Sequence, residues 1–110
     1  MKDKNIVVVR KVLEEIGIAR SILGDVELDA FLEDEVLKRA VCMTVINIGE
    51  LVKNLDDSFR AAHPSIPWKA IAGFRDIAAH KYQTLRMEDV YVTVHDDFDE
   101  LETMLQEISE

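Results

Sequence analysis

Three long stretches of the chain repeat apolar residues at the three- and four-residue spacing of an α-helix. The clearest is residues 87–109, whose stripe consists of Val90, Val94, Phe98, Leu101, Leu105 and Ile108. Residues 4–23 and 34–55 show the same period. Only four glycines and two prolines interrupt the 110 residues, which argues against a turn-rich β fold. The sequence therefore predicts an all-α protein built from long helices.

A further helix is predicted after the one rigid joint of the chain, which is residues 63–67 with prolines at 64 and 67. Proline suits a first helical turn because its missing N–H has no intrahelical partner there. We expect this helix to begin near Ser65–Pro67 and to end at about His80. The polar stretch Asp56–Pro64 is expected to hold one short helical turn anchored by Phe59. Four helices with short connections predict an antiparallel four-helix bundle, as a single domain over residues 1–110.

The helix predicted at 34–55 is apolar on two sides. Its core stripe is Leu37, Val41, Ile48, Val52 and Leu55. Its opposite face carries Val36, Ala40, Met43 and Ile46. A helix that is apolar all round is normally covered on both sides. One side can meet the core of the domain, and the other needs another helix or a second molecule, which favours a homodimer.

Charge is unevenly distributed along the chain, whose formal net charge is −9. Residues 53–86 carry six basic and three acidic groups, whereas residues 87–110 carry nine acidic and no basic groups. The overall charge disfavours non-specific coating of nucleic acid, and the basic segment is a candidate anion site. The acidic tail is usually solvated surface; the alternative is that it meets a basic partner.

Compartment and cofactors are constrained mainly by what the sequence lacks. A single cysteine, Cys42, excludes a disulfide within the chain and a cysteine-based zinc cage, and it suits a reducing compartment. The longest nearly uncharged run, residues 40–49, is half the length of a membrane span, and we expect no signal peptide and no membrane association. No His, Asp and Glu spacing matches a metal site, so we expect no metal, no cofactor and a cytoplasmic location.

The densest polar chemistry lies in residues 75–82, which contain Arg75, Asp76, His80 and Tyr82. Arginine is a permanent forked donor for phosphate oxygens. Histidine exchanges a proton near neutral pH. Together they form a minimal set for metal-free cleavage of RNA, in which one group moves the proton and the other stabilises the charge on phosphorus.

Helix geometry limits how these residues cooperate. Asp76 and His80 are four residues apart and share a face, so the carboxylate could orient the imidazole. Arg75 and His80 are five apart, about 140° around a regular helix, and cannot both point into one narrow pocket. Either the helix loosens before His80, or the working site combines residues of two protomers.

The pattern R-x4-H-x-Y, together with Ile66-Pro67-Trp68, Ile71-x-Gly73 and Ile48-Gly49-Glu50 in the same order, resembles the HepT-like branch of the HEPN superfamily. The resemblance covers nearly the whole chain. It implies a dimeric helical bundle with a ribonuclease site at the dimer cleft. It also implies a toxin of a type II toxin–antitoxin pair, whose partner is a minimal nucleotidyltransferase that transfers AMP to the motif tyrosine.

Carried over to this sequence, the resemblance implies a role for each motif residue. Arg75 would bind and stabilise the scissile phosphate, and His80 would be the general acid or base. Asp76 would be the polar residue that orients them, although this position is often Asn in the family and a carboxylate would repel phosphate. Tyr82 would be the AMPylated residue. The alternative for Tyr82 is an amphipathic ring that closes the bundle end with its hydroxyl at the surface.

Several other residues have two interpretations. Glu50 and Asn47 share a helix face and are expected at a dimer seam; the alternative places Glu50 beside Arg75 or His80 as an accessory group, and Lys81 is a second accessory candidate. Core packing is expected for Trp68 and Phe74, and the alternative is that they stack on nucleic-acid bases. Cys42 is expected in the core, His63 in a turn and His95 at the surface. A second function also stays open, namely a non-catalytic module that binds a nucleotide or phosphate and pairs with a nucleotidyltransferase.

Overall fold

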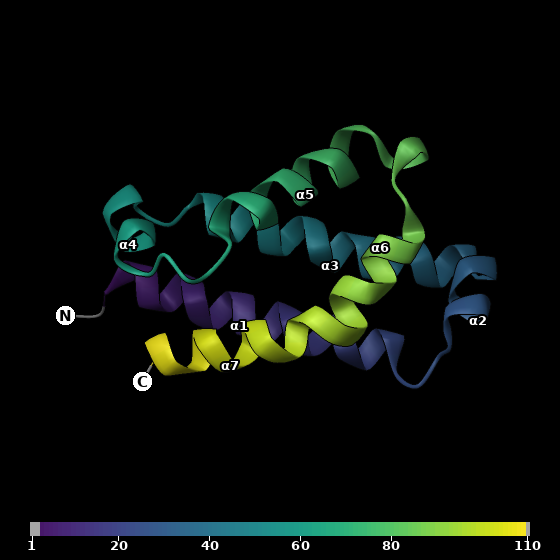
Figure 1. Cartoon of the computed structure of the whole chain (residues 1–110), viewed down its shortest axis with the longest axis horizontal. Helices are drawn as coiled ribbons and strands as arrows, with labels where there is room; N and C mark the ends of the chain where they lie inside the picture. The colour runs from purple at the N-terminus through teal and green to yellow at the C-terminus, as the bar shows by residue number, and fades with distance from the viewer. Residues whose placement is uncertain (1–2, 110) are drawn as a thin grey trace.

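The computed structural model describes residues 3–109, and within that range it is all-helical with no strand. The α-helices are α1 (Lys4–Leu23), α2 (Leu28–Glu33), α3 (Glu35–Lys53), α4 (Asp57–Ala62), α5 (Trp68–His80), α6 (Met87–Val92) and α7 (Phe98–Ser109). A 3-10 turn, η1 (Tyr82–Thr84), follows α5, and a π-helical segment, η2 (Thr93–Asp97), joins α6 to α7. The long helices alternate in direction, so the start of α1 and the end of α7 lie at the same end of the molecule (Figure 1). The predicted all-α fold is confirmed.

Helix α1 has the predicted bounds because both of its ends are defined by local signals. The Asp3 carboxylate accepts a hydrogen bond from the backbone N–H of Asn5 at 2.8 Å, which caps the first turn. Gly24 ends the helix with a φ of 55°, a left-handed value that favours glycine. Between these ends the apolar residues at helical spacing are buried, with Leu13 at their edge; the buried ones are Val9, Ile16, Ala19 and Leu23.

Helix α3 packs against both α1 and α5. The Asp34 carboxylate caps it by accepting from the Leu37 N–H at 3.0 Å. Val41, Ile48 and Val52 of the core stripe are buried, as predicted. On the opposite face Val36 is 80% exposed and Met43 is 56% exposed. The predicted second apolar face is therefore exposed at Val36 and Met43, whereas Ala40 and Ile46 on the same face are half-buried.

Helix α5 begins immediately after the proline joint. The Trp68 indole N–H donates to the carbonyl oxygens of Arg60 and His63, at 3.2 and 3.1 Å, and ties the end of α4 to the start of α5. Trp68 is buried, and Phe59 of α4 packs beside its ring. The expected helical turn between residues 56 and 64 is thus α4, and α5 then runs along α3.

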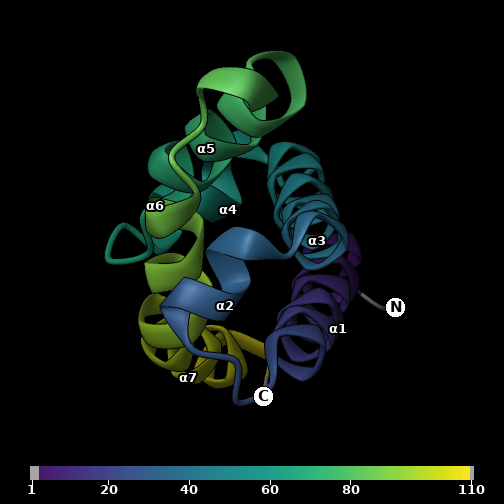
Figure 2. The same cartoon turned by 90° about the vertical axis from the view of Figure 1, so that its right-hand side faces the viewer.

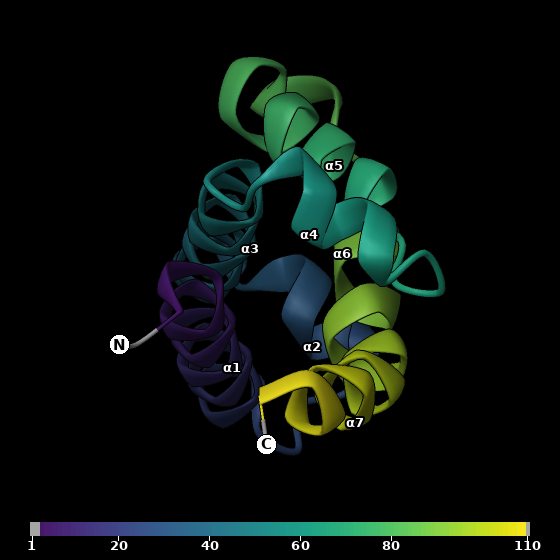
Figure 3. The same cartoon turned by 90° about the vertical axis from the view of Figure 1, so that its left-hand side faces the viewer.

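Two features differ from the sequence prediction. The connection after α1 contains α2, whose Phe31 is fully buried and packs on the ring of Tyr91 at 5.5 Å. Seen from either end of the molecule, α2 lies between the α1–α3 pair and α6 (Figures 2 and 3). The helix predicted over 87–109 is interrupted by η2. No described helix has both the length and the apolarity that crossing a bilayer requires.

Candidate functional site

Arg75, Asp76 and His80 lie on the last two turns of α5, and Tyr82 follows in η1. The helix is continuous through His80, and the Lys81 N–H still donates to the Ile77 carbonyl at 2.8 Å. The alternative in which the helix loosens before His80 is therefore wrong. Arg75 and His80 point about 140° apart on one protomer, as expected for a regular helix.

Gly49 allows α3 and α5 to approach each other closely at Arg75. A Cβ atom at position 49 would lie 2.1 Å from the Arg75 Cβ and 3.3 Å from the Ile71 carbonyl oxygen. The aliphatic part of Arg75 therefore lies directly over the glycine, and only 20% of its side chain is exposed. Its Nε is buried without a hydrogen-bond partner among the described residues. This contact fixes where the guanidinium group can be.

Two carboxylates contact the guanidinium group, and one amine contacts the second of these carboxylates. Arg75 Nη2 lies 2.9 Å from Glu50 Oε2, and Arg75 Nη1 lies 3.2 Å from Asp76 Oδ1. The Lys53 Nζ contacts the same Asp76 oxygen at 2.5 Å. We call Glu50, Lys53, Arg75 and Asp76 the charge cluster. It contains two cations and two anions, so its net charge is zero while all four are ionised.

The charge cluster settles two expectations made from the sequence. The alternative that places Glu50 beside Arg75 is confirmed, whereas Asn47 turns to the other side and donates to Glu15 Oε1 at 3.4 Å.

The hydrogen bond from Lys53 is the main cause that holds the pKa of Asp76 below its ordinary value, with a smaller contribution from Arg75. The Asp76 carboxylate is therefore ionised at neutral pH.

His80 lies outside the charge cluster. It is the last residue of α5, and its side chain is exposed, as is that of Lys81. No hydrogen bond or ion pair joins Asp76 to His80 within residues 3–109, because the carboxylate is engaged by Lys53 and Arg75. The pairing of these two residues expected from helix spacing is thus not formed in this protomer.

Tyr82 opens the turn η1 and packs against the core next to α3. Its ring lies under the guanidinium of Arg39, whose Cζ is 4.9 Å from the ring centre. Its hydroxyl is buried and has no hydrogen-bond partner among the described residues. Burial, followed by the nearby Cys42, raises the pKa of Tyr82 above its ordinary value. The alternative that places the Tyr82 hydroxyl at the surface is wrong, because the short turn after α5 folds the ring back onto α3.

The remaining candidates have structural positions. Cys42 is buried beside Met87, and burial raises the pKa of its thiol to about 11. His95 is exposed and stacks on Tyr91 at 5.0 Å, and Phe74 is half-buried. Among the described residues no three His, Cys, Asp or Glu side chains gather as a metal-binding group would.

Sequence reasoning missed two contributors, Lys53 and Gly49. Lys53 lies three residues after Glu50 and so faces the same side of the helix, which is the signal that could have placed it in the site. Gly49 stands in the middle of an apolar helix, where glycine costs about 1 kcal/mol relative to alanine. The presence of glycine at this position despite that cost indicates that another backbone approaches the helix closely there.

A helical fold with an Arg–His–Tyr motif at the end of one helix defines the class of protein. Residues 12–108 match the HepT-like family of ribonucleases, and the chain belongs to this family within the HEPN superfamily. The resemblance noted from the motifs is thereby confirmed. No solved structure matches the chain significantly.

Curated relatives come from both bacteria and archaea. A protein of Caldanaerobacter subterraneus named as a candidate RNase is 35% identical over 97 residues, which cover 88% of this chain and 87% of the relative. A candidate RNase of Methanocaldococcus jannaschii is 33% identical over 101 residues, which cover 88% and 84%. A Thermococcus cleftensis protein named as a probable ribonuclease HepT is 28% identical over 97 residues, 88% of each chain.

Proposed function

We propose that this chain is a metal-independent endoribonuclease and the toxin of a type II toxin–antitoxin pair. The observation that carries the proposal is the family match over residues 12–108, within which Arg75, His80 and Tyr82 of the motif are all present. The substrate is RNA, since cleavage without a metal uses the 2′-hydroxyl of the ribose as the nucleophile.

In the proposed reaction the His80 imidazole removes the proton of the 2′-hydroxyl group. The 2′-oxygen then attacks phosphorus, and the bond to the 5′-oxygen breaks. The leaving oxygen takes a proton from an imidazolium, and the product is a 2′,3′-cyclic phosphate. The guanidinium of Arg75 binds the phosphate oxygens and stabilises the charge that develops on them.

The working site is proposed to combine two protomers. His80 cannot face the phosphate held by Arg75 of its own helix, because the two side chains diverge by about 140°. The exposed Val36 and Met43 supply an apolar face for a second copy. A homodimer that buries this face would bring His80 of the partner subunit toward Arg75, and two imidazoles would then serve as base and acid.

The charge cluster is proposed to keep the Arg75 guanidinium in position until a phosphate of the RNA replaces its carboxylate partners. Glu50 and Asp76 keep the guanidinium in place while no phosphate is bound. A phosphate would compete with these carboxylates for the same N–H donors. Lys53 adds a second cation on the Asp76 side, so that we expect it to contact an adjacent phosphate of the RNA.

Inhibition is proposed to occur by AMPylation of Tyr82 by a minimal nucleotidyltransferase antitoxin. The Tyr82 hydroxyl would attack the α-phosphorus of ATP and release pyrophosphate. Because this hydroxyl is buried, the ring must first leave its place under Arg39. The attached AMP would put a phosphate two residues from His80, where it repels RNA and occupies cationic donors.

The nuclease proposal is tested with purified protein and RNA in the presence of EDTA. We expect cleavage that leaves a 2′,3′-cyclic phosphate, loss of at least about 100-fold in rate for His80→Ala, and an unchanged rate for the control His95→Ala. Equal cleavage by wild type and His80→Ala would overturn the nuclease assignment. A growth test with the same variants checks toxicity, which should disappear with the imidazole.

The inhibition proposal is tested by intact mass after co-expression with a minimal nucleotidyltransferase. The mass should rise by one or more AMP units in the wild type and in Tyr91→Phe, but not in Tyr82→Phe. An unmodified wild-type chain in a stable, inactive complex would overturn AMPylation and leave inhibition by steric blocking.

A second candidate function, a non-catalytic module that binds a nucleotide or phosphate, is favoured by one observation. Arg75 is held between two carboxylates, so the cluster attracts phosphate less than a free guanidinium would. This candidate predicts binding of AMP or phosphate that depends on Arg75, with no RNA cleavage by the wild type. The EDTA assay therefore separates the two functions.

A further inference from the structure

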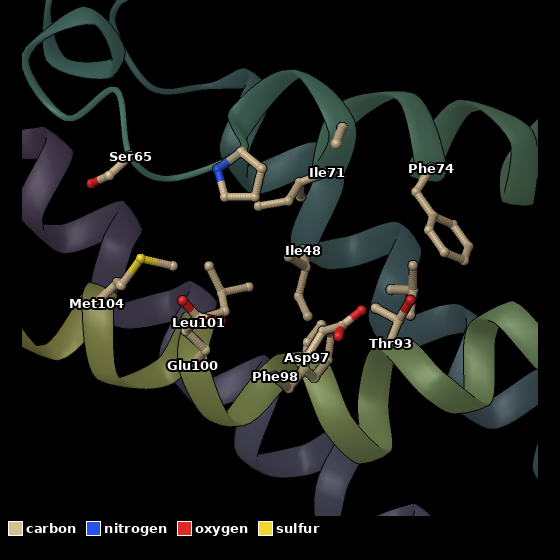
Figure 4. A pocket seen from close by; sticks show the side chains of 13 residues that line it. Ile48, Ser65, Ile71, Phe74, Thr93, Asp97, Phe98, Glu100, Leu101 and Met104 are labelled. Carbon is tan, nitrogen blue, oxygen red and sulfur yellow. The ribbon is translucent and has the colours of Figure 1, made fainter.

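An apolar groove lies between α5 and the C-terminal helical segment (Figure 4). Its cavity measures about 400 Å³. Ile71 and Phe74 of α5 form one wall, Phe98 and Met104 of α7 form the other, and Ile48 of α3 lies at the base. No residue of the charge cluster lines it, and neither do His80 or Tyr82.

The groove is open because its two walls pack on different partners. Helix α5 makes its main contacts with α3, whereas η2 and α7 pack on α1. The walls therefore diverge, and Ile71, Phe74 and Met104 stay only half-buried. A cavity of this size is within the range of about 300–1,000 Å³ typical of ligand sites, and it can accept several apolar side chains.

The rim of the groove carries negative charge. Asp97 and Glu100 line it with exposed carboxylates, and none of its lining residues is Lys, Arg or His. The whole segment 87–110 contains nine acidic and no basic residues. Anionic lipid and nucleic acid are therefore disfavoured occupants, and so is the acidic segment 87–110 of a second copy of this chain.

We propose that the groove binds an amphipathic helix of a partner protein whose apolar face is flanked by Lys and Arg. Side chains at positions i, i+3 or i+4, and i+7 of that helix enter between Phe74 and Phe98, as in other helix-in-groove complexes. Its basic residues pair with Asp97 and Glu100 at the rim. Met104 has an unbranched, adaptable side chain that can fit the entering residues. This surface is separate from the nuclease chemistry and does not depend on it.

The experiment uses a fluorescent 14-residue peptide with leucines on one helical face and lysines on the other. We expect saturable one-to-one binding that weakens as salt increases. Ala70→Trp fills the groove from the exposed side of α5 without changing charge, and Ser65→Trp does so from the preceding loop. Each should weaken binding by at least about tenfold, the equivalent of 1.4 kcal/mol, while circular dichroism and RNA cleavage are unchanged.

Matched charge variants separate the groove from general attraction to an acidic protein. The pair Asp97→Asn with Glu100→Gln should weaken binding and reduce its salt dependence. The pair Glu88→Gln with Asp89→Asn makes the same charge change outside the groove lining and should bind like the wild type. An equal loss in both pairs, or full binding by the folded Trp variants, would overturn the proposal. So would a change of oligomeric state in Ala70→Trp, which would make a second copy the occupant.

Discussion

Replacing Gly49 by alanine tests the close crossing of α3 and α5 on which the position of Arg75 depends. The added Cβ would lie 2.1 Å from the Arg75 Cβ, whereas two carbon atoms in contact need about 3.5 Å. The Arg75 Cβ is attached to the backbone and cannot rotate away, and the Ile71 carbonyl is also close. The helices must therefore separate by about 1.4 Å, and the Glu50–Arg75 ion pair must rearrange.

The expected loss of stability is the overpacking cost minus the gain in helix propensity. Overpacking of a packed interface costs about 1–3 kcal/mol, and a clash with backbone-fixed atoms belongs at the upper end. Gly→Ala in a helix returns about 1 kcal/mol. Gly49→Ala should thus lower the free energy of unfolding by about 2 kcal/mol, which is roughly 8–12 °C in Tm for a chain of this length.

Two glycines of the same protein are matched controls. Nothing lies within 4 Å of a Cβ added at Gly17 or Gly73, and both glycines are helical. Gly17→Ala and Gly73→Ala should therefore raise the free energy of unfolding by about 0.5–1 kcal/mol. Urea denaturation followed by circular dichroism measures all three. If Gly49→Ala stabilises the protein as Gly17→Ala does, the close crossing inferred here does not exist. Combination with Arg75→Gly should recover part of the loss as a coupling energy of about 1 kcal/mol.

Three further predictions concern buried side chains. Tyr82→Phe should stabilise the fold by about 1 kcal/mol in urea denaturation, because it removes a buried hydroxyl that makes no hydrogen bond. Burial raises the pKa of Tyr82 in the folded state. The part of the free energy of unfolding that depends on the neutral hydroxyl is therefore complete below the ordinary pKa of 10.0 and is lost as pH rises through the folded-state pKa. Alkaline denaturation of Tyr82→Phe should begin at higher pH than that of the wild type. The pKa of the Cys42 thiol is about 11 in the folded protein and 9.0 ordinarily, so the reactive thiolate is about 100-fold less abundant at pH 8. Cys42 should therefore react with an aromatic disulfide about 100-fold more slowly in the folded protein than in the unfolded chain. Equal rates would contradict its burial. Trp68→Phe should cost about 1–3 kcal/mol in the same urea assay, because two carbonyl oxygens at the α4–α5 joint lose their indole donor, and an unchanged midpoint would show that the joint does not need it.

The long helices were predictable because the spacing of their apolar residues and the residues that start or end a helix indicate the same boundaries. Residues 4–23 are bounded by Asp3 and Gly24, and the proline joint gives the start of α5 to within a residue or two. Helix α2 was missed because six residues are too short to show a period. Its Phe31 is fully buried all the same, since α2 packs between α3 and α6.

The identity of the site residues was predictable, but their pairing was not. The motif names Arg75 and His80 of α5, whereas Glu50 and Lys53 of the charge cluster come from α3. The contact of Arg75 with Glu50, and that of Lys53 with Asp76, depend on how α3 and α5 cross at Gly49. The buried hydroxyl of Tyr82 likewise depends on the direction of the turn after α5, which residue spacing does not encode.

The widened turn η2 is a place where one residue can be deleted without changing the register of the C-terminal helix. Val90, Val94 and Phe98 are all buried although four-residue steps drift by about 40° each on a regular α-helix. The π-helical turn absorbs one extra residue and keeps the flanking stripes in line. Shortening the chain by one residue elsewhere in α6 or α7 would rotate everything beyond it by about 100° and turn Leu101 or Leu105 away from α1. Between residues 93 and 97 the same deletion would convert the wide turn to an ordinary one and leave both ends in register.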